Sequence, residues 1–382
     1  QLYGTRRTFF LTGGTTQGIL AGCLVIARRG RRVLLARNCH VSMINGAVLA
    51  GLDPEYIQSA GKIPAEEEFI AALENRRDRP AALVITNPGY EGGGIEIGNI
   101  AGHCREAGIL LVVDEAHGTH FPFTEGAPAS AITVQGCDLV FHSLHKYLGS
   151  FVQTGLAHVP QESQIDGEEF RRALELLEST TRSNLLMLSI EEALARAFST
   201  EGRNGFRRTA ENVGDLHRKL SSFGEVLSCS REAFQDPLKL FLTSDRAPGA
   251  VIAERFLARG IDNEFFTSEG SLYIFSFRNA SEQFRQFESA AGEVYHELAG
   301  REKFSCPVQP FRYNIPVMRN SPREAFMALE VREVPLREAV GRINCTNYVK
   351  CPPGIPVLIP GEEITAWHVE NLPGEWKIRV MA

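Results

Sequence analysis

Short apolar runs alternate with amphipathic stretches through the first 160 residues of the chain. The amphipathic stretches have the periodicity of helices and lie at residues 17–29, 64–76 and 97–107. The apolar runs predict strands at residues 8–12, 32–36, 81–86, 109–113 and 137–141. Strands that are apolar along their whole length and are separated by helices are typical of a mainly parallel sheet with helices on both faces. This part of the chain is therefore predicted to have an α/β fold.

A different pattern follows. Residues 162–200 are polar and helical, and a long amphipathic helix is predicted at residues 212–223. The leucines expected to pack in the polar helical stretch are Leu174, Leu177, Leu185, Leu188 and Leu194. Further on, two predicted strands flank a predicted helix, at residues 236–242, 249–259 and 271–277. We therefore predict a large domain over residues 1–214 and a smaller C-terminal α+β domain over residues 215–382.

The segment Cys351-Pro352-Pro353-Gly354-Ile355-Pro356, followed by Pro360-Gly361-Glu362, is rich in residues that interrupt regular structure. Proline lacks the backbone N–H that a helix needs, so this segment is predicted to be an ordered, turn-rich loop.

Composition narrows the classes of function. The net charge of −6 and the pI near 6.0 argue against a nucleic-acid-binding protein, which is usually basic. No apolar stretch reaches the roughly 18 residues that a membrane span needs. Because the chain begins with Gln1 and enters a predicted strand almost at once, we expect that an upstream segment is missing, together with any organellar targeting signal.

The cysteines form no CxxC pair and no spacing typical of zinc, and several lie inside apolar runs. They are Cys23, Cys39, Cys104, Cys137, Cys229, Cys306, Cys345 and Cys351. The simplest interpretation is a reduced, cytoplasmic protein without a metal centre.

Ligands of parallel α/β sheets bind beyond the carboxyl ends of the strands. The first such end is Thr12-Gly13-Gly14-Thr15-Thr16-Gln17-Gly18, between a predicted strand and a predicted helix. Glycines let a phosphate approach the backbone, the Thr15 and Thr16 hydroxyls can donate to it, and a helix N-terminus favours its charge. A plain turn in which a threonine caps the helix is the alternative interpretation. The segment is not a Walker loop, because no lysine follows at the required position.

Two further strand ends carry a carboxylate and an amine. Asp114 ends an apolar strand, where a carboxylate is costly unless it is paired, and Lys146 follows Ser143-x-His145 after the next strand. Pyridoxal phosphate requires a carboxylate that keeps its pyridine nitrogen protonated, a lysine that can form an imine, and hydroxyl and imidazole groups for its phosphate. A metal-binding Asp-Glu pair and an ordinary surface lysine are the alternatives.

Other residues at the same strand ends fit this cofactor. The small side chain of Ala116 would let a flat ring lie against it, and His40 could stack on a heteroaromatic ring. A partly buried Lys146 beside the cofactor would have a lowered pKa and be nucleophilic.

Several motifs together resemble the Orn/Lys/Arg decarboxylase family (group III) of the fold-type I, aspartate-aminotransferase-like superfamily. They occur in the order of that family over nearly the whole chain: Phe9-Phe10-Leu11-x-Gly13-Gly14-Thr15-Thr16, Arg37-Asn38-Cys39-His40-x-Ser42, Thr86-Asn87-Pro88-x-Tyr90, Val113-Asp114-Glu115-Ala116-His117-Gly118, Ser143-x-His145-Lys146 and the proline-rich segment described above.

The resemblance implies a role for each residue. Lys146 would bond covalently to pyridoxal 5'-phosphate, His40 would stack on its ring, and Asp114 would pair with the pyridine nitrogen. The phosphate would be held by Thr15, Thr16, Ser143 and His145. The resemblance also implies that the substrate is a small molecule, an amino acid, and that the protein is a homodimer or larger homo-oligomer with sites at subunit interfaces.

The resemblance further implies decarboxylation of a basic amino acid, arginine or lysine ahead of ornithine. His40 or His117 would return a proton to Cα after carbon dioxide leaves. Glu264, Glu362 or a residue of the missing N-terminal segment would bind the distal cation of the substrate. An aminotransferase or lyase on the same cofactor, and a relative that binds the cofactor without catalysis, remain alternatives.

The chain departs from the family pattern at the substrate-facing end. Where the family has Ser-Ala-Glu after Gly-Arg-Ile, this chain has Asn344-Cys345-Thr346 after Gly341-Arg342-Ile343. Cys351 replaces the tyrosine that precedes Pro-Pro-Gly in the family. The cofactor residues are therefore complete, whereas the identity of the substrate stays open.

Overall fold

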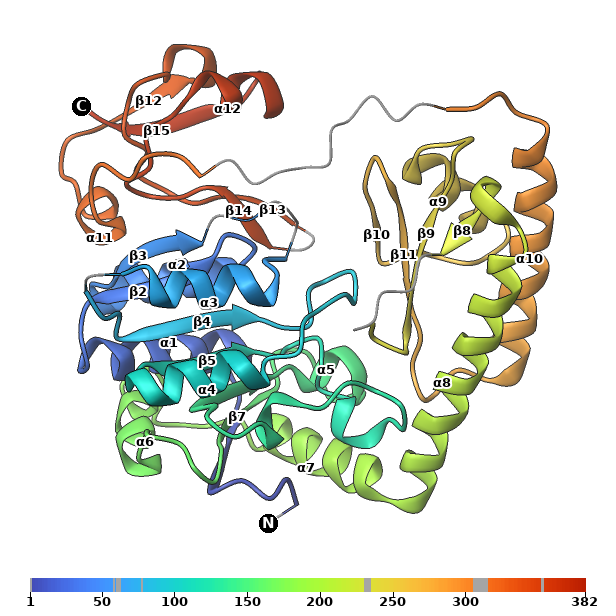
Figure 1. Ribbon diagram of the computed structural model, residues 1–382, viewed down its shortest axis with the longest axis horizontal. Coiled ribbons are helices and arrows are strands. Elements are labelled where there is room, and N and C mark those ends of the chain that lie inside the picture. Colours follow the sequence, from blue (N-terminus) through green and yellow to red (C-terminus); the bar gives the residue numbers. More distant parts are fainter. Residues whose placement is uncertain are drawn as a thin grey trace.

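The central element of the computed structural model is a seven-stranded sheet with the strand order β1-β7-β6-β5-β4-β2-β3 (Figure 1). The structure describes residues 2–57, 59, 63–76, 78–229, 235–304, 315–351 and 354–382. The strands are β1 (Arg7–Leu11), β2 (Arg32–Ala36), β3 (Asp53–Ile57), β4 (Ala82–Thr86), β5 (Leu110–Asp114), β6 (Leu139–His142) and β7 (Gly155–Val159). β3, β2, β4, β5 and β6 are parallel to one another, while β7 runs antiparallel to both β6 and β1. The predicted α/β class is confirmed.

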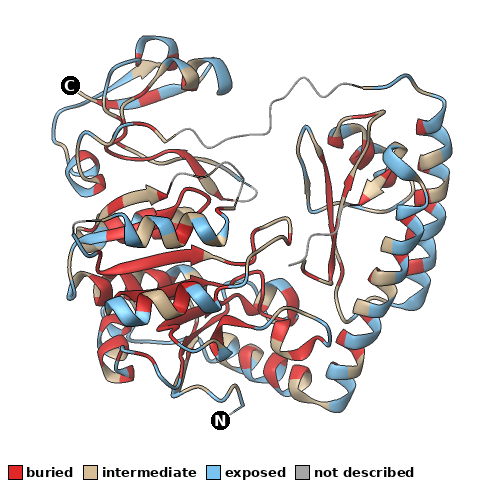
Figure 2. Ribbon diagram, in the orientation of Figure 1, coloured by how far each residue is buried: buried red, intermediate tan, exposed pale blue. Residues whose placement is uncertain are grey.

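Helices cover both faces of this sheet, because successive side chains of a strand point to opposite sides. Val33 and Leu35 of β2 belong to the core that includes α1 (Gly14–Ala27), α2 (Val41–Ala50) and α6 (Gly167–Glu175). Leu34 and Ala36 belong to the core under α3 (Glu66–Glu74) and α4 (Gly98–Ala107). The buried positions accordingly follow the sheet strands and the inner faces of the helices (Figure 2).

A second sheet has the antiparallel order β10-β11-β9-β8. Its strands are β8 (Ser228–Cys229), β9 (Lys239–Thr243), β10 (Phe265–Phe266) and β11 (Gly270–Ile274), and its core includes residues of α8 (Thr200–Ser221), α9 (Gly249–Leu257) and α10 (Ser281–Ala299). The helix predicted at residues 212–223 is the C-terminal half of α8, and the domain boundary near residue 215, which falls within this helix, stays a prediction.

The last part of the chain forms two hairpin-like pairs that lie beside α2 and β3, away from the second sheet (Figure 1). β12 (Val331–Pro335) pairs with β15 (Lys377–Met381), and β13 (Tyr348–Lys350) pairs with β14 (Ile355–Leu358). The remaining helices are α5 (Leu144–Tyr147), α7 (Asn184–Phe198), α11 (Pro322–Phe326), α12 (Ala366–Asn371) and the 3-10 turns Phe121–Phe123, Ala131–Thr133, Gly224–Val226 and Leu336–Glu338. No helix in the described part of the chain is long and apolar enough to cross a membrane.

Two expectations from the sequence were wrong. Leu185 and Leu188 are 62% and 61% exposed, because α7 packs through a different face that includes Ile190 and Leu194. The proline-rich segment is not wholly a loop, since its later part is strand β14. This strand belongs to a two-stranded sheet, in which each strand is an edge strand and proline is tolerated. Cys306, Pro352 and Pro353 lie outside the described residues, and the other cysteines are free thiols.

A buried ion pair attaches the C-terminal part to the large sheet. Arg37, just after β2, lies 3.4 Å from Glu362, and their side chains are 3% and 0% exposed. Arg37 also donates a hydrogen bond of 2.6 Å to the carbonyl of Pro356, and Glu362 accepts one of 2.8 Å from the Ile359 amide. Burial raises the pKa of Glu362, and Arg37 opposes that rise. The pair therefore holds residues more than 300 positions apart in the chain.

We predict that Arg37→Met lowers the free energy of unfolding by about 3–5 kcal/mol, because Glu362 would be left buried without its cation. Chemical denaturation measures this change. Arg285→Met is the control, since Arg285 pairs with Glu282 on the exposed surface of α10 and should cost less than about 1 kcal/mol. Equal losses in the two variants would contradict the role given to the buried pair.

Candidate functional site

The carboxyl ends of β2, β4, β5 and β6 and the N-terminus of α1 surround one open pocket with about 1160 Å³ of empty space. Every residue predicted to bind the cofactor or to act in catalysis lines it: Gly14, Thr15, Thr16, His40, Asp114, Ala116, His117, Ser143, His145 and Lys146. The pocket is also lined by residues that the sequence did not single out as site residues, namely Gly13, Asn38, Thr86, Gly89, Tyr90, Val152, Gln153 and Ile355. The tertiary structure thus brings the predicted residues together in a space large enough for a cofactor and a small substrate.

One end of the pocket is suited to an anion. α1 begins at Gly14, and its N-cap residue Gly13 has no side chain to cap the first turn, although the Gly13 amide donates to the Gln17 side chain at 2.9 Å. The Gly14 amide donates to the Gln153 carbonyl at 2.9 Å, and Thr15 and Thr16, whose amides have no intrahelical partner, line the pocket. The Thr15 and Ser143 hydroxyls lie 3.1 Å apart. Amides and hydroxyls converge here as phosphate recognition requires.

His145 lies at the same end. Its Nδ1 donates a hydrogen bond of 3.0 Å to the Thr154 carbonyl. Burial lowers the pKa of His145, the Thr154 hydrogen bond opposes this, and the nearby Lys146 charge lowers it further. Because Nδ1 is already a donor, Nε2 can donate to an anion only when the ring is protonated, and a phosphate would favour that form.

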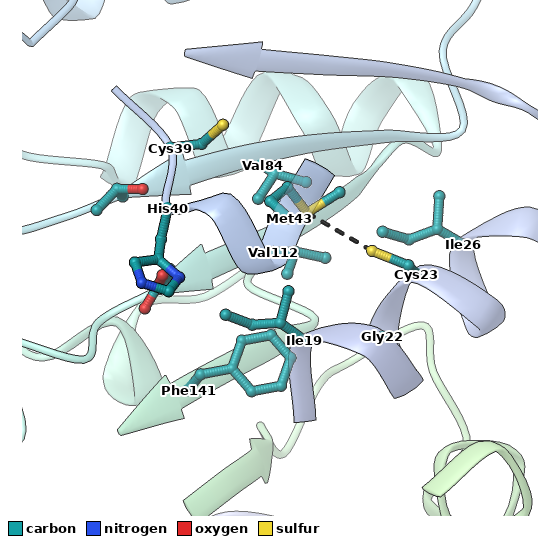
Figure 3. Close-up of a pocket in the computed structure, with 12 residues that line it drawn as sticks. Ile19, Gly22, Cys23, Ile26, Cys39, His40, Met43, Val84, Val112 and Phe141 are labelled. Carbon is teal, nitrogen blue, oxygen red and sulfur yellow. Dashed lines mark hydrogen bonds between the residues drawn. The ribbon is translucent and has the colours of Figure 1, made fainter. Parts of the chain in front are cut away.

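Asp114 stands between this polar pocket and a smaller apolar cavity. It is 8% exposed, and its Oδ1 accepts a hydrogen bond of 3.1 Å from the Ala116 amide. The smaller cavity lies behind it and is lined by apolar side chains of α1, α2 and the sheet, among them Ile19, Met43 and Phe141 (Figure 3). A carboxylate with apolar surroundings on one side is stabilised by a cationic or hydrogen-bonding partner on the other.

His40 is the N-cap residue of α2. Its Nδ1 accepts hydrogen bonds from the Ser42 amide at 3.2 Å and from the Ser42 hydroxyl at 2.8 Å, so the ring proton is on Nε2. Burial lowers the pKa of His40, which Asp114 opposes and Lys146 reinforces. Gly354 packs so closely on the ring that an added Cβ would lie 2.8 Å from its atoms. Gly354, in the C-terminal part of the chain, therefore packs against the His40 ring and restricts its position.

Lys146 and His117 lie in contact in the pocket. Lys146, on the short helix α5, faces the open pocket, and its Nζ lies 2.8 Å from Nε2 of His117. Partial burial lowers the pKa of Lys146, while Asp114 and Glu264 oppose that shift. Burial also lowers the pKa of His117 well below its ordinary value, and the two neighbouring lysines, Lys146 and Lys239, add to the shift.

Glu115, next to Asp114, does not line the pocket. It accepts hydrogen bonds from Ser130, from the Ala131 amide at 2.8 Å and from His142 at 2.6 Å. Glu115 is therefore used within the protein and does not share a ligand with Asp114.

Lys239 and Tyr90 are neighbours of the site that received no individual role from the sequence. Lys239 reaches the site from β9 and donates to the Tyr90 carbonyl at 2.9 Å. The Tyr90 ring packs edge-on against His117 with centroids 4.5 Å apart, and its hydroxyl donates to Glu264 at 2.5 Å. The one sequence signal for Lys239 is a charged residue inside an otherwise apolar strand.

Comparison with known proteins agrees with this arrangement. Residues 1–298 match the major domain of the Orn/Lys/Arg decarboxylases, and residues 309–371 match the C-terminal domain of the same enzymes. The chain belongs to the Orn/Lys/Arg decarboxylase family. The predicted family, and with it the predicted class of enzyme, is confirmed.

Among curated members of the family, the chain is similar to the arginine decarboxylase of Halalkalibacterium halodurans, with 29% identity over 96% of this chain and 77% of that protein. It is also similar to the arginine decarboxylase of Bacillus subtilis, with 28% identity over 97% of this chain and 78% of that protein. The structure is similar to that of the Escherichia coli constitutive lysine decarboxylase, with a TM-score of 0.76, 18% identity, and coverage of 100% of this chain and 71% of that one. At this identity the structural likeness concerns the fold.

The positions at which this family member departs from the pattern have different surroundings. Asn344 is fully buried and donates a hydrogen bond of 2.7 Å to the Ile359 carbonyl, so it supports the C-terminal fold. Cys351 is exposed, and its thiol is near enough to raise the pKa of Tyr90, although burial and Glu264 contribute more. The Glu362 side chain is 0% exposed and paired with Arg37, which removes it as a ligand of the substrate.

Proposed function

We propose that this member of the family decarboxylates a basic amino acid, arginine or lysine ahead of ornithine, with pyridoxal 5'-phosphate as its cofactor. The proposal rests on one observation: Asp114, His40 and Lys146 line the same pocket as Thr15, Thr16 and Ser143, the residues suited to an anion. The family and the curated arginine decarboxylases support the reaction, because they place the chain among enzymes of this class.

The residues present fit this cofactor. Thr15, Thr16, Ser143 and His145 would hold its phosphate, since their donors converge at the N-terminus of α1. The largely buried Asp114 carboxylate would be satisfied by a protonated pyridine nitrogen, and the small Ala116 leaves room for a ring. Lys146 would attach the cofactor covalently through its amine.

The bound cofactor supplies the electron sink for the pair of electrons left when carbon dioxide leaves. Asp114 would keep that sink effective by holding the positive charge of the ring nitrogen. His40, which carries its proton on Nε2, and His117, at 2.8 Å from Lys146, both line the pocket and would be the candidates to return a proton to Cα. Tyr90 and Ile355 would narrow the pocket around the substrate.

Glu264 is the carboxylate that we assign to the distal cation of the substrate. Its side chain hydrogen-bonds Tyr90, which lines the pocket, and its charge raises the pKa of Lys146. Glu264 is exposed, so it can exchange water for a ligand, whereas the other candidate, Glu362, is committed to Arg37.

We also propose a homodimer or larger homo-oligomer. Phe151 and Val152 are 53% and 78% exposed at the edge of the pocket, and Leu185 and Leu188 of the nearby α7 are exposed as well. The Phe151 amide donates to Ser189, which ties this loop to α7. An apolar surface beside the site favours coverage by a second copy. A cytoplasmic location stays a prediction.

The reaction is tested by incubating the protein and pyridoxal phosphate with arginine, lysine and ornithine in turn. We expect carbon dioxide and the corresponding amine in equal amounts from arginine or lysine. Lys146→Ala should abolish product and the absorbance band of the lysine-bound cofactor, because the covalent attachment is lost. A keto acid that forms only with an amino acceptor would point to an aminotransferase, and cofactor binding without any product would contradict the proposal.

We predict that Ser143→Ala weakens cofactor binding by about ten- to a hundredfold, because a hydrogen bond to a charged group is worth about 1.5–3 kcal/mol. Titration of the cofactor-free protein with pyridoxal phosphate, followed by absorbance, measures the dissociation constant. Ser221→Ala removes an exposed hydroxyl of α8 and serves as the control. Unchanged affinity in Ser143→Ala would remove this residue from the phosphate site.

We expect Glu264→Gln to raise KM for arginine or lysine by about tenfold or more, because the charge is lost while the acceptor for Tyr90 remains. The effect should be absent with norleucine, which lacks a distal cation, if that amino acid is turned over. Glu254→Gln, at an exposed position of α9, is the matched control. A KM that does not respond to Glu264→Gln would assign the distal cation to another group.

A further inference from the structure

Lys239 is a fully buried lysine delivered to the site by a different sheet. It lies in β9, and its side chain is 0% exposed. A buried ammonium is costly unless each of its three N–H groups finds an acceptor. The partners of Lys239 therefore indicate the protonation of the groups around it.

Three atoms surround the Nζ of Lys239. The Tyr90 carbonyl lies at 2.9 Å, Nδ1 of His117 at 3.3 Å, and an oxygen of Asp236 at 3.6 Å. Nδ1 of His117 accepts from this ammonium only if it carries no proton itself. The ammonium then donates hydrogen bonds to the Tyr90 carbonyl and to His117, and it forms an ion pair with Asp236.

Asp236 decides which group carries the positive charge. It is fully buried and accepts hydrogen bonds from His120 at 2.9 Å and Tyr147 at 3.1 Å. Nδ1 of His120 has no hydrogen-bond partner among the described residues, which favours a neutral ring, because a charged one would leave an N–H unsatisfied. The cation that balances Asp236 is therefore Lys239.

The consequence reaches Lys146. A neutral His117 that lacks a proton on Nδ1 carries it on Nε2, which lies 2.8 Å from Nζ of Lys146. An N–H there needs a lone pair to accept it, and only a neutral amine has one. The opposite arrangement, in which Lys146 is the ammonium and Lys239 the amine, would leave Asp236 buried without a cation.

We propose that Lys239 is a positioning residue that keeps Lys146 a neutral, nucleophilic amine by fixing the tautomer of His117. The proposal rests on the role given above to Lys146 and adds a residue from the second sheet to it. Other charges also face these groups. Asp114 and Glu264 favour the ammonium form of Lys146, while His40 and His120 face His117.

The test follows the reactivity of Lys146 in cofactor-free protein, as the rate at which acetic anhydride labels its amine between pH 6 and 10. Mass spectrometry of the peptide that contains Lys146 measures this rate. The pH at which the labelling rate of Lys146 is half its maximum is the midpoint. In Lys239→Met this midpoint should rise by about one pH unit or more, so that labelling below the midpoint is about tenfold slower. The reason is that His117 can then carry its proton on Nδ1 and accept from a Lys146 ammonium.

Two comparisons separate this route from simple charge repulsion. In a His117→Phe background, Lys239→Met should shift the midpoint much less, because the connecting imidazole is gone. Lys219→Met, which removes an exposed lysine of α8, should leave the midpoint unchanged. A midpoint that does not move in Lys239→Met, or that moves equally in both backgrounds, would overturn the proposal.

A measurement on the wild-type protein remains decisive if Lys239→Met does not fold. Nitrogen-15 NMR of labelled histidines, with the His117 signal assigned by its loss in His117→Phe, distinguishes the two tautomers. A proton on Nε2 supports the proposal, and a proton on Nδ1 overturns it. Neither experiment involves substrate or turnover, so a failure of the decarboxylation assay would not affect either result.

Discussion

Register between neighbouring parallel strands is the constraint on which this site depends. β4, β5 and β6 pair so that Thr86 lies beside Asp114 and Asp114 lies beside Phe141. The carboxyl ends of the three strands are therefore nearly aligned, which brings the loops that contain His117 and Ser143 together. A slip of one residue would turn Asp114 to the opposite face of the sheet. The two apolar cores on the two faces prevent such a slip, because alternate residues of each strand are buried in each.

Three parts of the chain supply the site, and buried polar contacts hold them in place. The large sheet and its loops carry Asp114, Lys146 and the N-terminus of α1. The second sheet contributes Lys239, whose ammonium is satisfied only where β9 meets the loops of the large sheet. The C-terminal part contributes Gly354 and Ile355, and the Arg37–Glu362 pair anchors it. Because unpaired buried charges are costly, movement of either smaller part away from the site is unfavourable.

The strands of the large sheet could be predicted where their residues are apolar on both faces. All five runs predicted from the first 160 residues are strands, with ends that differ by no more than two residues. β3 and β7 were not predicted. β3 lies at the sheet edge and includes Asp53, Pro54 and Glu55, which do not resemble a buried strand, and the buried β7 includes His158. Leu185 and Leu188 were wrongly assigned to the core because periodicity does not show which side of α7 meets the rest of the molecule.

The sequence by itself determined the chemistry available to this protein. A glycine- and threonine-rich helix start, a carboxylate that ends an apolar strand and a lysine after Ser-x-His are local features, and parallel strands must bring their ends together. Only the tertiary structure decided which charged residues serve the site and which serve the fold. Glu362 follows a proline-rich segment and Lys239 begins an apolar strand, yet one is buried against Arg37 and the other reaches His117. Their roles depend on burial and on partners distant in the chain, which no local pattern encodes.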